Sequence, residues 1–326
     1  MAYDLQSALS ALAEAGGLGL AVVSVGDPLP EGPGVVRVGV CRDGPLPTSG
    51  LEAFDILLSA DPAAPAPWVG LAPEALEAAL VRLESVVAEQ PVAAGVAAQV
   101  LRLTLSLPLD QALVVESLAY SMLLASASLK AWRIRTPVKQ RGDEDAPRLA
   151  LSRDGDALHI RLTRPDARNA FDARMRDALV DALEGALADP SAGPVLLTGE
   201  GPSFSAGGDL NEFGQATDPG IAHAIRALRS PAALVTRLGA RVTVHAHGAC
   251  VGAGIEVTAA AARGVGAAGA SFRLPEVSMG LVPGAGGTAT IPRRIGRHRA
   301  AYMALTGYPI DLATALAWGL VDEPGP

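Results

Sequence analysis

Two glutamates, Glu256 and Glu276, are the residues of this chain with the clearest potential for chemistry. They lie twenty positions apart, in the segments GAGIE (252–256) and LPEVSMGLVPGAGG (274–287), each beside a glycine-rich turn. Two neighbouring carboxylates can share one water and handle its proton and its oxygen separately. Backbone N–H groups in tight glycine turns can hold an oxyanion. Together these groups predict the addition of water to a double bond next to a carbonyl.

The elements that must position these glutamates belong to an alternating pattern that starts at residue 149. A hairpin turns at Asp154 and Gly155, a helix covers 171–189, and a buried strand covers 193–200. The segment RVTVHAHGACVGAG (241–254) runs from a strand through a turn into the helix that carries Glu256. This alternation predicts an α/β fold with a mostly parallel sheet covered by helices.

The residues before 149 divide into three further parts. Strands are expected over 18–25, 35–40 and 54–60, after a helix over 4–15. Apolar residues then recur at helical spacing, and Pro73 suits the first position of a helix. The predicted parts of the whole chain are a small α/β unit of unknown role (1–67), a helical region (68–134), a charged linker (135–148) and the core (149–326).

Composition limits the partners of this chain. The 326 residues are 49% hydrophobic and carry a net charge of −8, and no run of Lys or Arg exceeds two residues. These features argue against a nucleic-acid partner. Cys41 and Cys250 show no metal-ligand spacing, and the longest apolar runs are interrupted by Gln, Arg, Pro and Gly. The N-terminus lacks the basic region of a signal peptide. We therefore expect a cytoplasmic protein with no bound metal and no membrane partner.

Five segments of the core carry a resemblance to a known family. They are IRLTRPDARNAFD, GPVLLTGEGPSFSAGGDL, VHAHGACVGAGIEVTAA, FRLPEVSMGLVPGAGGTATIPRRIG and ALTGYPIDLATALAWGLVDE. In this order and spacing, residues 158–323 resemble the enoyl-CoA hydratase/isomerase (crotonase) superfamily. The resemblance implies a crotonase-like spiral of ββα units that forms a site for a CoA thioester.

The resemblance also implies roles for single residues. Two backbone N–H groups would bind the thioester oxygen, those of Ala206 in FSAGGD and Ala253 in GAGIE, where the family usually has Gly at the second place. Glu256 and Glu276 match the two glutamates of hydratases, whereas isomerases of the family typically keep only the one at 276. Glu276 is assigned the proton exchange with the α-carbon, and Glu256 the orientation of the hydroxyl. The alternative for Glu256 is a charge stabilised by the helix dipole.

Two further turns are expected to hold the substrate. The turn RNAF (168–171) resembles the place where the family seats CoA, and Arg168 could meet a phosphate there. The alternative is a helix entry capped by Asn169 or Asp172, and Asp209 is also a candidate helix cap. The predicted substrate- and CoA-binding residues are Arg168, Asn169, Ala170, Phe171, Gly207, Gly208, Asp209 and Leu210.

The helices before the core resemble the C-terminal helices with which family members cap the site. Residues 73–102 and 107–133 match that tail in length, helix order and pattern, whereas the core ends at LVDEPGP. This predicts a circular permutation, with Pro326 lying close to residues 68–73. The alternative is an unrelated helical domain beside a truncated core.

The function that these observations favour is that of an enoyl-CoA hydratase-like lyase of fatty acid metabolism. It would hydrate a trans-2-enoyl-CoA reversibly to a 3-hydroxyacyl-CoA, with coenzyme A carried by the substrate and no other cofactor. The family also suggests a homo-oligomer, a trimer or a multiple of it. The alternatives are another acyl-CoA enzyme of the superfamily (an isomerase, a retro-aldol lyase or a thioesterase) and a non-catalytic subunit that binds CoA thioesters.

Overall fold

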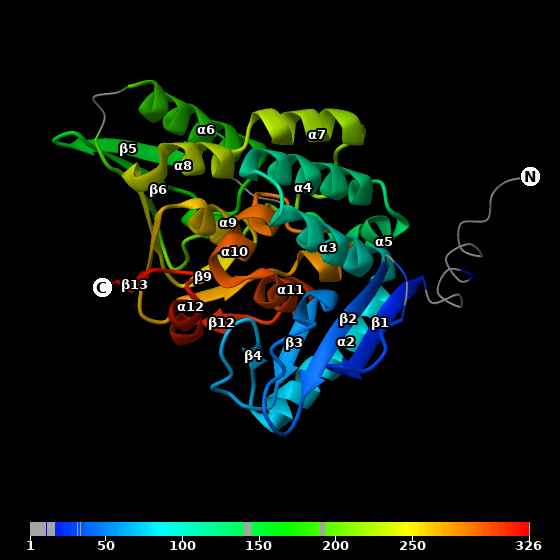
Figure 1. Cartoon of the computed structure of the whole chain (residues 1–326). Coiled ribbons are helices and arrows are strands. Elements are labelled where there is room, and N and C mark those ends of the chain that lie inside the picture. Colours follow the sequence, from blue (N-terminus) through cyan, green and yellow to red (C-terminus); the bar gives the residue numbers. More distant parts are fainter. Residues whose placement is uncertain are drawn as a thin grey trace, which may run out of the picture.

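The computed structural model describes residues 17–30, 34–139, 145–189 and 193–325, together with Ala11 and Gly32. Apart from Ala11, the helix predicted over 4–15 lies outside these residues. Pro326 also lies outside them, so its predicted position beside 68–73 stays a prediction. Figure 1 shows two strand-rich parts with a layer of helices packed between and above them.

The larger part is built on a six-stranded sheet, and it confirms the predicted α/β core. The strand order is β13-β10-β8-β7-β6-β5, and every neighbouring pair is parallel except the β5–β6 hairpin at Asp154 and Gly155. The strands are β5 (Leu149–Asp154), β6 (Ala157–Leu162), β7 (Val195–Gly199), β8 (Val242–Ala246), β10 (Arg263–Gly266) and β13 (Glu323–Pro324).

A three-stranded sheet and seven helices complete this core. The sheet has the order β12-β11-β9, from β9 (Ala249–Val251), β11 (Ser271–Arg273) and β12 (Ile310–Asp311). The helices are α6 (Ala173–Ala188), α7 (Pro219–Leu228), α8 (Pro231–Leu238), α9 (Ala253–Ala260), α10 (Gly287–Ile295), α11 (Arg297–Thr306) and α12 (Leu312–Trp318). Three short 3-10 helices of the core are η2 (Pro165–Ala167), η3 (Gly239–Arg241) and η4 (Glu276–Met279), and a fourth, η1 (Leu51–Ala53), lies before it.

The three strands predicted before residue 67 are present, and a fourth joins them. They form an all-parallel sheet in the order β1-β2-β3-β4, from β1 (Leu18–Ser24), β2 (Gly34–Cys41), β3 (Ile56–Ser59) and β4 (Val69–Gly70). The inward side chains of β2 and β3 belong to the same hydrophobic cluster as the core helices. Arg299 of α11 also donates to the carbonyl of Trp68, 3.1 Å away. This sheet is therefore packed onto the rest of the chain.

Four helices follow the small sheet in sequence, the first of them packed beside that sheet and the others nearer the core (Figure 1). They are α2 (Pro73–Glu89), α3 (Pro91–Thr104), α4 (Leu109–Leu124) and α5 (Ala127–Arg135). Pro73 and Pro91 occupy first helical positions, where the missing N–H costs no hydrogen bond. Helices α2 and α3 contact α11, and α3 and α4 contact α10. The helical region thus docks on the core.

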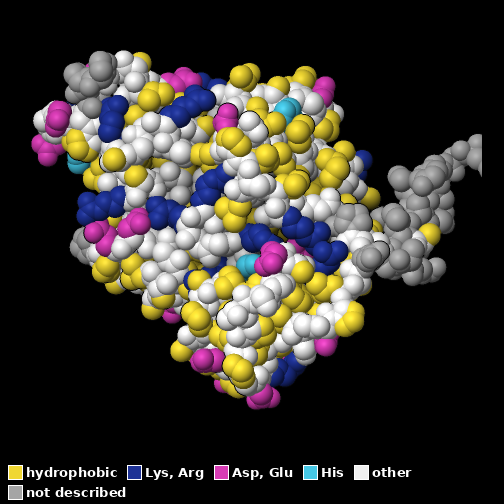
Figure 2. Space-filling model, viewed as in Figure 1, with side chains coloured by type: hydrophobic (Ala, Val, Ile, Leu, Met, Phe, Trp, Pro, Cys, Tyr) yellow, Lys and Arg dark blue, Asp and Glu magenta, His cyan; other side chains and the backbone are white. Residues whose placement is uncertain are grey.

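Two surface features follow from this arrangement. Hydrophobic side chains gather over α4 and α7 (Figure 2), where Met122 is 55% exposed and Leu228 is 78% exposed. No single helix of the described ranges is long and apolar enough to cross a bilayer. Helices α4 and α5 reach that length and composition only together, and they are bent by 66° at their junction.

Candidate active site

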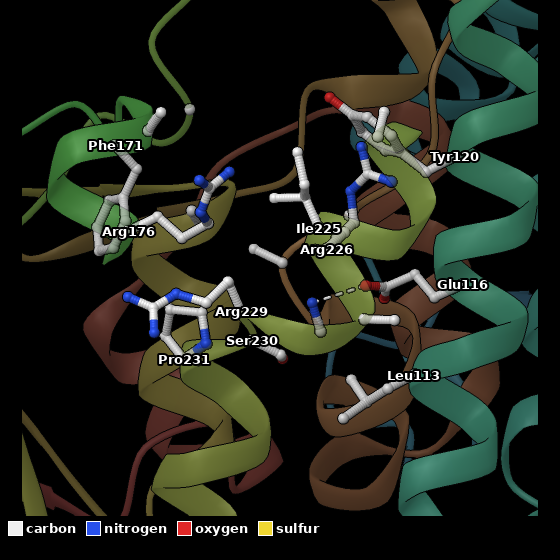
Figure 3. A pocket seen from close by; sticks show the side chains of 18 of the residues that line it. Leu113, Glu116, Tyr120, Phe171, Arg176, Ile225, Arg226, Arg229, Ser230 and Pro231 are labelled. Carbon is white, nitrogen blue, oxygen red and sulfur yellow. Dashed lines mark hydrogen bonds between the residues drawn. The ribbon is translucent and has the colours of Figure 1, made fainter. Parts of the chain in front are cut away.

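A pocket of about 690 Å³ opens between the core and the helical region. The core supplies its floor through residues of the glycine-rich turns, and α4, α6, α7 and α8 supply its walls (Figure 3). Five of the residues that the sequence singles out line this pocket: Phe171, Gly208, Ala253, Glu256 and Glu276. Within the described residues, no group of three His, Cys, Asp or Glu side chains could hold a metal ion.

Parallel strand pairing brings the two glutamates to one place. Strands β9 and β11 are parallel neighbours, with Val251 paired to Arg273. The chain enters α9 directly after β9 and η4 shortly after β11, so Glu256 and Glu276 follow the same edge of one sheet. A bridge between Ser205 and Cys250 places the FSAGGD turn beside this edge as well. Three segments that are distant in sequence therefore meet at the pocket floor.

Glu256 is a buried carboxylate that two amides hold in place. It lies in the first turn of α9 and is 1% exposed. Its Oε2 accepts hydrogen bonds from the N–H groups of Ala285 and Gly287, both at 2.7 Å. A Cβ at Gly287 would lie 2.7 Å from the Cγ of Glu256, so only glycine permits this approach. Burial raises the pKa of Glu256 to about 7, although the two hydrogen bonds act in the opposite direction.

Glu276, the second catalytic candidate, has a buried carboxylate oxygen without a hydrogen-bond partner among the described residues. It begins η4 and is 7% exposed, and the oxygen without a partner is Oε2. Its Oε1 lies against Gly252, which has φ +48° and where any side chain would collide with this oxygen. Burial, and then the negative charge of Glu256, raise the pKa of Glu276 well above its usual value. An unbonded buried oxygen in a pocket wall is available to a ligand.

Glu116 of α4 is a third buried carboxylate, and sequence reasoning missed it. It accepts from the N–H groups of Gly286 and Thr288 and from the Thr288 hydroxyl, each at 2.7 Å. Burial and the charge of Glu256 raise its pKa to about 8. The amides of the 285–288 turn thus alternate between Glu256 and Glu116. The signal that could have found it is an acid in the middle of the otherwise apolar helix LDQALVVESLAYSMLL, away from Asp110 in its first turn.

Tyr120 and Arg226 form the side of the pocket that lies opposite Arg176 and Arg229 (Figure 3). The Arg226 guanidinium lies 4.2 Å from the centre of the Tyr120 ring (Figure 3). The same ring packs closely on Gly284, at the start of the turn that holds Glu256. Tyr120 is 9% exposed, and burial raises the pKa of its hydroxyl above the usual value. The aromatic ring therefore joins the turn of the core to the helix α7.

The structure corrects one of the two predicted oxyanion donors. The N–H of Ala206 donates to the carbonyl of Arg168 at 2.8 Å, and Ala206 does not line the pocket. The prediction for Ala206 is wrong because its only donor is already used inside the fold. Gly208 and Ala253 do line the pocket, and neither N–H has a hydrogen-bond acceptor among the described residues. Ala253 is the first residue of α9, a position whose N–H has no partner within the helix.

Two residues predicted to bind substrate have structural partners within the fold. The side chain of Asn169 is fully buried, and it bonds the Arg164 amide and the carbonyls of Glu200 and Ser203. The Asp209 carboxylate pairs with Arg164 at 2.7 Å. Neither residue lines the pocket, so a contact of either with the substrate stays a prediction. Asp172, and not Asn169, caps α6 by accepting from the Met175 amide.

The remaining residues of that predicted set fall into two groups. Phe171 and Gly208 line the pocket. Four others lie outside its lining, and their contacts with CoA stay predictions: Arg168, Ala170, Gly207 and Leu210.

Comparison with known proteins places this geometry in a family context. A family model described as enoyl-CoA hydratase/isomerase matches residues 153–326. The 2,3-dehydroadipyl-CoA hydratase of Escherichia coli (strain K12) is 33% identical over 186 residues, which cover 55% of this chain and 69% of that protein. The hydroxycinnamoyl-CoA hydratase-lyase of Pseudomonas fluorescens is 32% identical over 178 residues, covering 53% of this chain and 64% of that protein.

Solved structures agree over the same part of the chain. A putative enoyl-CoA hydratase/isomerase from Mycobacterium abscessus is 34% identical with a TM-score of 0.51, covering 54% of this chain and 70% of its own. An enoyl-CoA hydratase from Mycobacterium smegmatis is 29% identical, also with a TM-score of 0.51, covering 55% of this chain and 70% of its own. About half of this chain is thus similar to about two thirds of each relative.

Proposed function

Because this chain belongs to the enoyl-CoA hydratase/isomerase family and is an enzyme of that family, we propose that it hydrates a trans-2-enoyl-CoA reversibly to a 3-hydroxyacyl-CoA. The observation that carries this proposal is the pair of buried glutamates lining one pocket, Glu256 with two hydrogen-bonded amides and Glu276 with a free oxygen. Isomerisation needs one acid/base group, whereas hydration uses two.

In this proposal, two amides bind the thioester oxygen. The unused N–H groups of Gly208 and Ala253 both line the pocket, and they would hold that oxygen as negative charge develops on it. Polarisation of the thioester makes the β-carbon of the conjugated alkene electrophilic. The Ala253 amide also lies at the N-terminus of α9, where the helix dipole favours negative charge.

The two glutamates then divide the work on one water. The pKa of Glu256 is raised less than that of Glu276, because two amide hydrogen bonds stabilise the Glu256 carboxylate. We assign the charged form to Glu256 and the protonated form to Glu276. Glu256 accepts a proton from water as the water oxygen bonds to the β-carbon, and Glu276 gives its proton to the α-carbon. The sum of these steps is the addition of one water.

Glu116 acts in this proposal as a positioning residue. Its two oxygens already accept three hydrogen bonds from the 286–288 segment, which hold the carboxylate in place. By holding Gly286 and Thr288 it fixes the turn whose other two amides orient Glu256. The helical region thereby contributes to catalysis without touching the reacting atoms.

The test of the proposed function is direct. Purified protein is mixed with trans-2-butenoyl-CoA, the absorbance of the conjugated thioester is followed, and the product mass is measured. Hydration predicts loss of absorbance, a product heavier by one water, and loss of both in Glu256→Gln and Glu276→Gln. A product of unchanged mass would indicate an isomerase, free CoA a thioesterase, and binding without turnover a non-catalytic subunit.

The remaining proposals concern the whole molecule. We propose that α2–α5 are the capping helices of the family in permuted order, and their contacts with α10 and α11 support this. Superposing α2–α5 on the terminal helices of a complete relative tests it, and different positions would favour an unrelated domain. A cytoplasmic location, a homo-oligomer and the lack of any cofactor beyond the CoA of the substrate are likewise proposals.

A further inference from the structure

Arg226 is a partly buried arginine of the pocket without an acidic partner among the described residues. Arg226 of α7 lines the cavity, and its Nη1 donates to the hydroxyls of Ser121 and Ser117 at 2.9 Å and 3.3 Å. Its guanidinium stacks on the ring of Tyr120. Among the described residues, no carboxylate forms an ion pair with it. Its partners are therefore two neutral hydroxyls and an aromatic face.

Two other half-buried arginines of the same pocket are paired. Arg176 forms an ion pair with Asp177 at 2.9 Å, and Arg229 pairs with Asp177 at 3.3 Å and with Asp181. Both lie on the α6 side of the pocket, across from Arg226 and Tyr120 (Figure 3). The fold thus neutralises Arg176 and Arg229 on one side of the cavity and leaves Arg226 as a cation on the other.

The physical chemistry of guanidinium makes this cation a candidate anion site. Arginine keeps its charge inside proteins, since its proton is bound too tightly to be lost. A partly buried cation with only hydroxyl and ring partners has lost hydration without gaining a counter-ion. A carboxylate would fit the remaining N–H groups with charge-assisted hydrogen bonds.

The position of Arg226 indicates which part of a substrate would reach it. Tyr120 packs on Gly284, which begins the turn that holds Glu256, and Arg226 lies on the ring of Tyr120. The Tyr120 ring therefore lies between Arg226 and the turn that holds Glu256. The nearby acid Glu116 interacts with Arg226 through its charge, but its carboxylate is bonded to the Gly286 and Thr288 amides and forms no ion pair with Arg226 among the described residues.

We infer that this pocket selects 2-enoyl thioesters whose acyl chain ends in a carboxylate, which Arg226 binds. The inference rests on the proposed function, since it places the thioester at Gly208 and Ala253 and the far end of the chain at Arg226. A phosphate of CoA presents the same anionic chemistry and is the competing ligand. A purely structural role, as a counter-charge to the three glutamates, is the other competing explanation.

The experiment uses matched substrates and variants of the full chain. The substrates are 2-hexenoyl and 2-hexenedioyl thioesters, each made on CoA and on pantetheine, which lacks the nucleotide phosphates. The variants are Arg226→Gln, Arg226→Lys and, as the matched control, Arg229→Gln. The readout is kcat/KM, with the melting temperature of each variant as a check on folding.

The expected result is a loss confined to the diacid chain. Arg226→Gln should lower kcat/KM for 2-hexenedioyl thioesters by about 10²-fold on both carriers, since it removes one partner of a desolvated charge pair. It should change kcat/KM for 2-hexenoyl thioesters by no more than about 3-fold, the effect of an altered neutral contact. Arg226→Lys should restore part of the diacid activity, and Arg229→Gln should affect both chains equally.

Three outcomes would overturn the inference. A loss on CoA that disappears on pantetheine would assign Arg226 to a phosphate. An equal loss for both acyl chains on both carriers would make its role structural. Wild-type protein with no preference for the diacid would remove the selectivity itself.

A binding measurement separates this inference from the proposed function. Calorimetry with the saturated hexanedioyl-CoA and hexanoyl-CoA needs no turnover. Tighter binding of the diacid that Arg226→Gln abolishes would support the inference even if hydration were absent. Equal binding of the two would contradict the inference even if hydration were present.

Discussion

Two walls of the pocket, one from the core and one from α4, each contribute a buried glutamate to the same turn. The core wall presents Glu256 beside glycines that let the backbone approach it. The helical wall presents Glu116 from an otherwise apolar helix. Glu256 takes the amides of Ala285 and Gly287, and Glu116 takes those of Gly286 and Thr288. The turn between them is a shared part, and its geometry depends on both walls.

The hydrogen-bond partners distinguish the glutamate proposed to act on the substrate, Glu276, from the one proposed to support the turn, Glu116. Glu116 accepts hydrogen bonds from three donors of the turn, which hold its carboxylate against that turn. Glu276 keeps a buried oxygen with no partner in the described part of the chain. Burying an unpaired acceptor costs stability, and a fold tolerates that cost where the atom has a function. The four predictions below test this division, beginning with the largest effect.

The first prediction concerns the free oxygen of the core wall. Glu276→Gln should lower kcat by about 10³–10⁴-fold, because an amide cannot give a proton to the α-carbon. It should leave the melting temperature unchanged or raise it, because the variant removes a poorly compensated buried acid. Enzyme kinetics and thermal unfolding check the two parts. A variant with a lower melting temperature and an unchanged kcat would reverse the division between chemistry and support.

The second prediction removes a backbone donor from the core wall. Ala253→Pro should lower kcat by about 10²–10³-fold, since it deletes one N–H of the proposed oxyanion site. Stability should change little, because proline is well suited to the first position of a helix. Kinetics of the folded variant check this result. Unchanged kcat with retained fold would contradict the role of the Ala253 amide.

The third prediction addresses the helical wall. Glu116→Gln should lower kcat by about 10-fold with KM nearly constant, because the turn that orients Glu256 loses its support. The charge of Glu256 raises the pKa of Glu116, so the two carboxylates titrate together, and Glu116→Gln should change the shape of the pH–rate profile by removing one of these titrations. Kinetics from pH 5 to pH 9 measure both effects.

Two further variants separate positioning from stability in the same wall. Thr288→Val removes only the hydroxyl donor to Glu116 and leaves both amide bonds, so it should lower kcat less than Glu116→Gln. Glu116→Ala should lower the free energy of unfolding by about 3 kcal/mol, because it leaves two buried amides without acceptors. If every variant loses stability in proportion to kcat and none changes the pH profile, Glu116 is structural only.

The fourth and smallest prediction is a dependence of stability on pH. Burial raises the folded-state pKa of Glu256 from 4.5 to about 7 and that of Glu116 from 4.5 to about 8. Between these values the folded protein binds more protons than the unfolded chain, so the free energy of unfolding should fall as pH rises from 4.5 to about 8. Urea unfolding along this range should show the slope, and Glu116→Gln should flatten it. A wild-type slope of the opposite sign would refute the raised pKa values.

Much of the core and part of the site could be predicted from the pattern of residues. The hairpin at Asp154 and Gly155 and the strand before GAGIE follow from local turn chemistry and alternation. Glu256 and Glu276 stand out because a charged residue beside glycines in an apolar segment is costly to bury and therefore indicates a function. The family assignment rests on the same segments, which lie in order along residues 153–326.

The error at Ala206 has a physical cause that a sequence does not display. The orientation of each amide in FSAGGD depends on backbone dihedral angles, including φ +89° at Gly207, and Ala206 turns toward the carbonyl of Arg168. Asn169 and Asp209 have polar partners drawn from distant segments, and these satisfy them inside the fold. A turn can therefore be located from its residues while the direction of its donors stays undetermined.

The amino-acid sequence by itself determined the local elements, the two reactive acids and their place beside tight turns, because these depend on short-range preferences and spacing. Tertiary structure alone decided that α4 and α7 complete the pocket, and that Glu116, Tyr120 and Arg226 face it. Glu116 and Gly286 are 170 positions apart, so their hydrogen bond exists only because long-range packing brings the two segments together. The periodicity of a helix indicates which of its faces is buried. It does not indicate which distant segment packs against that face, because this depends on the tertiary structure.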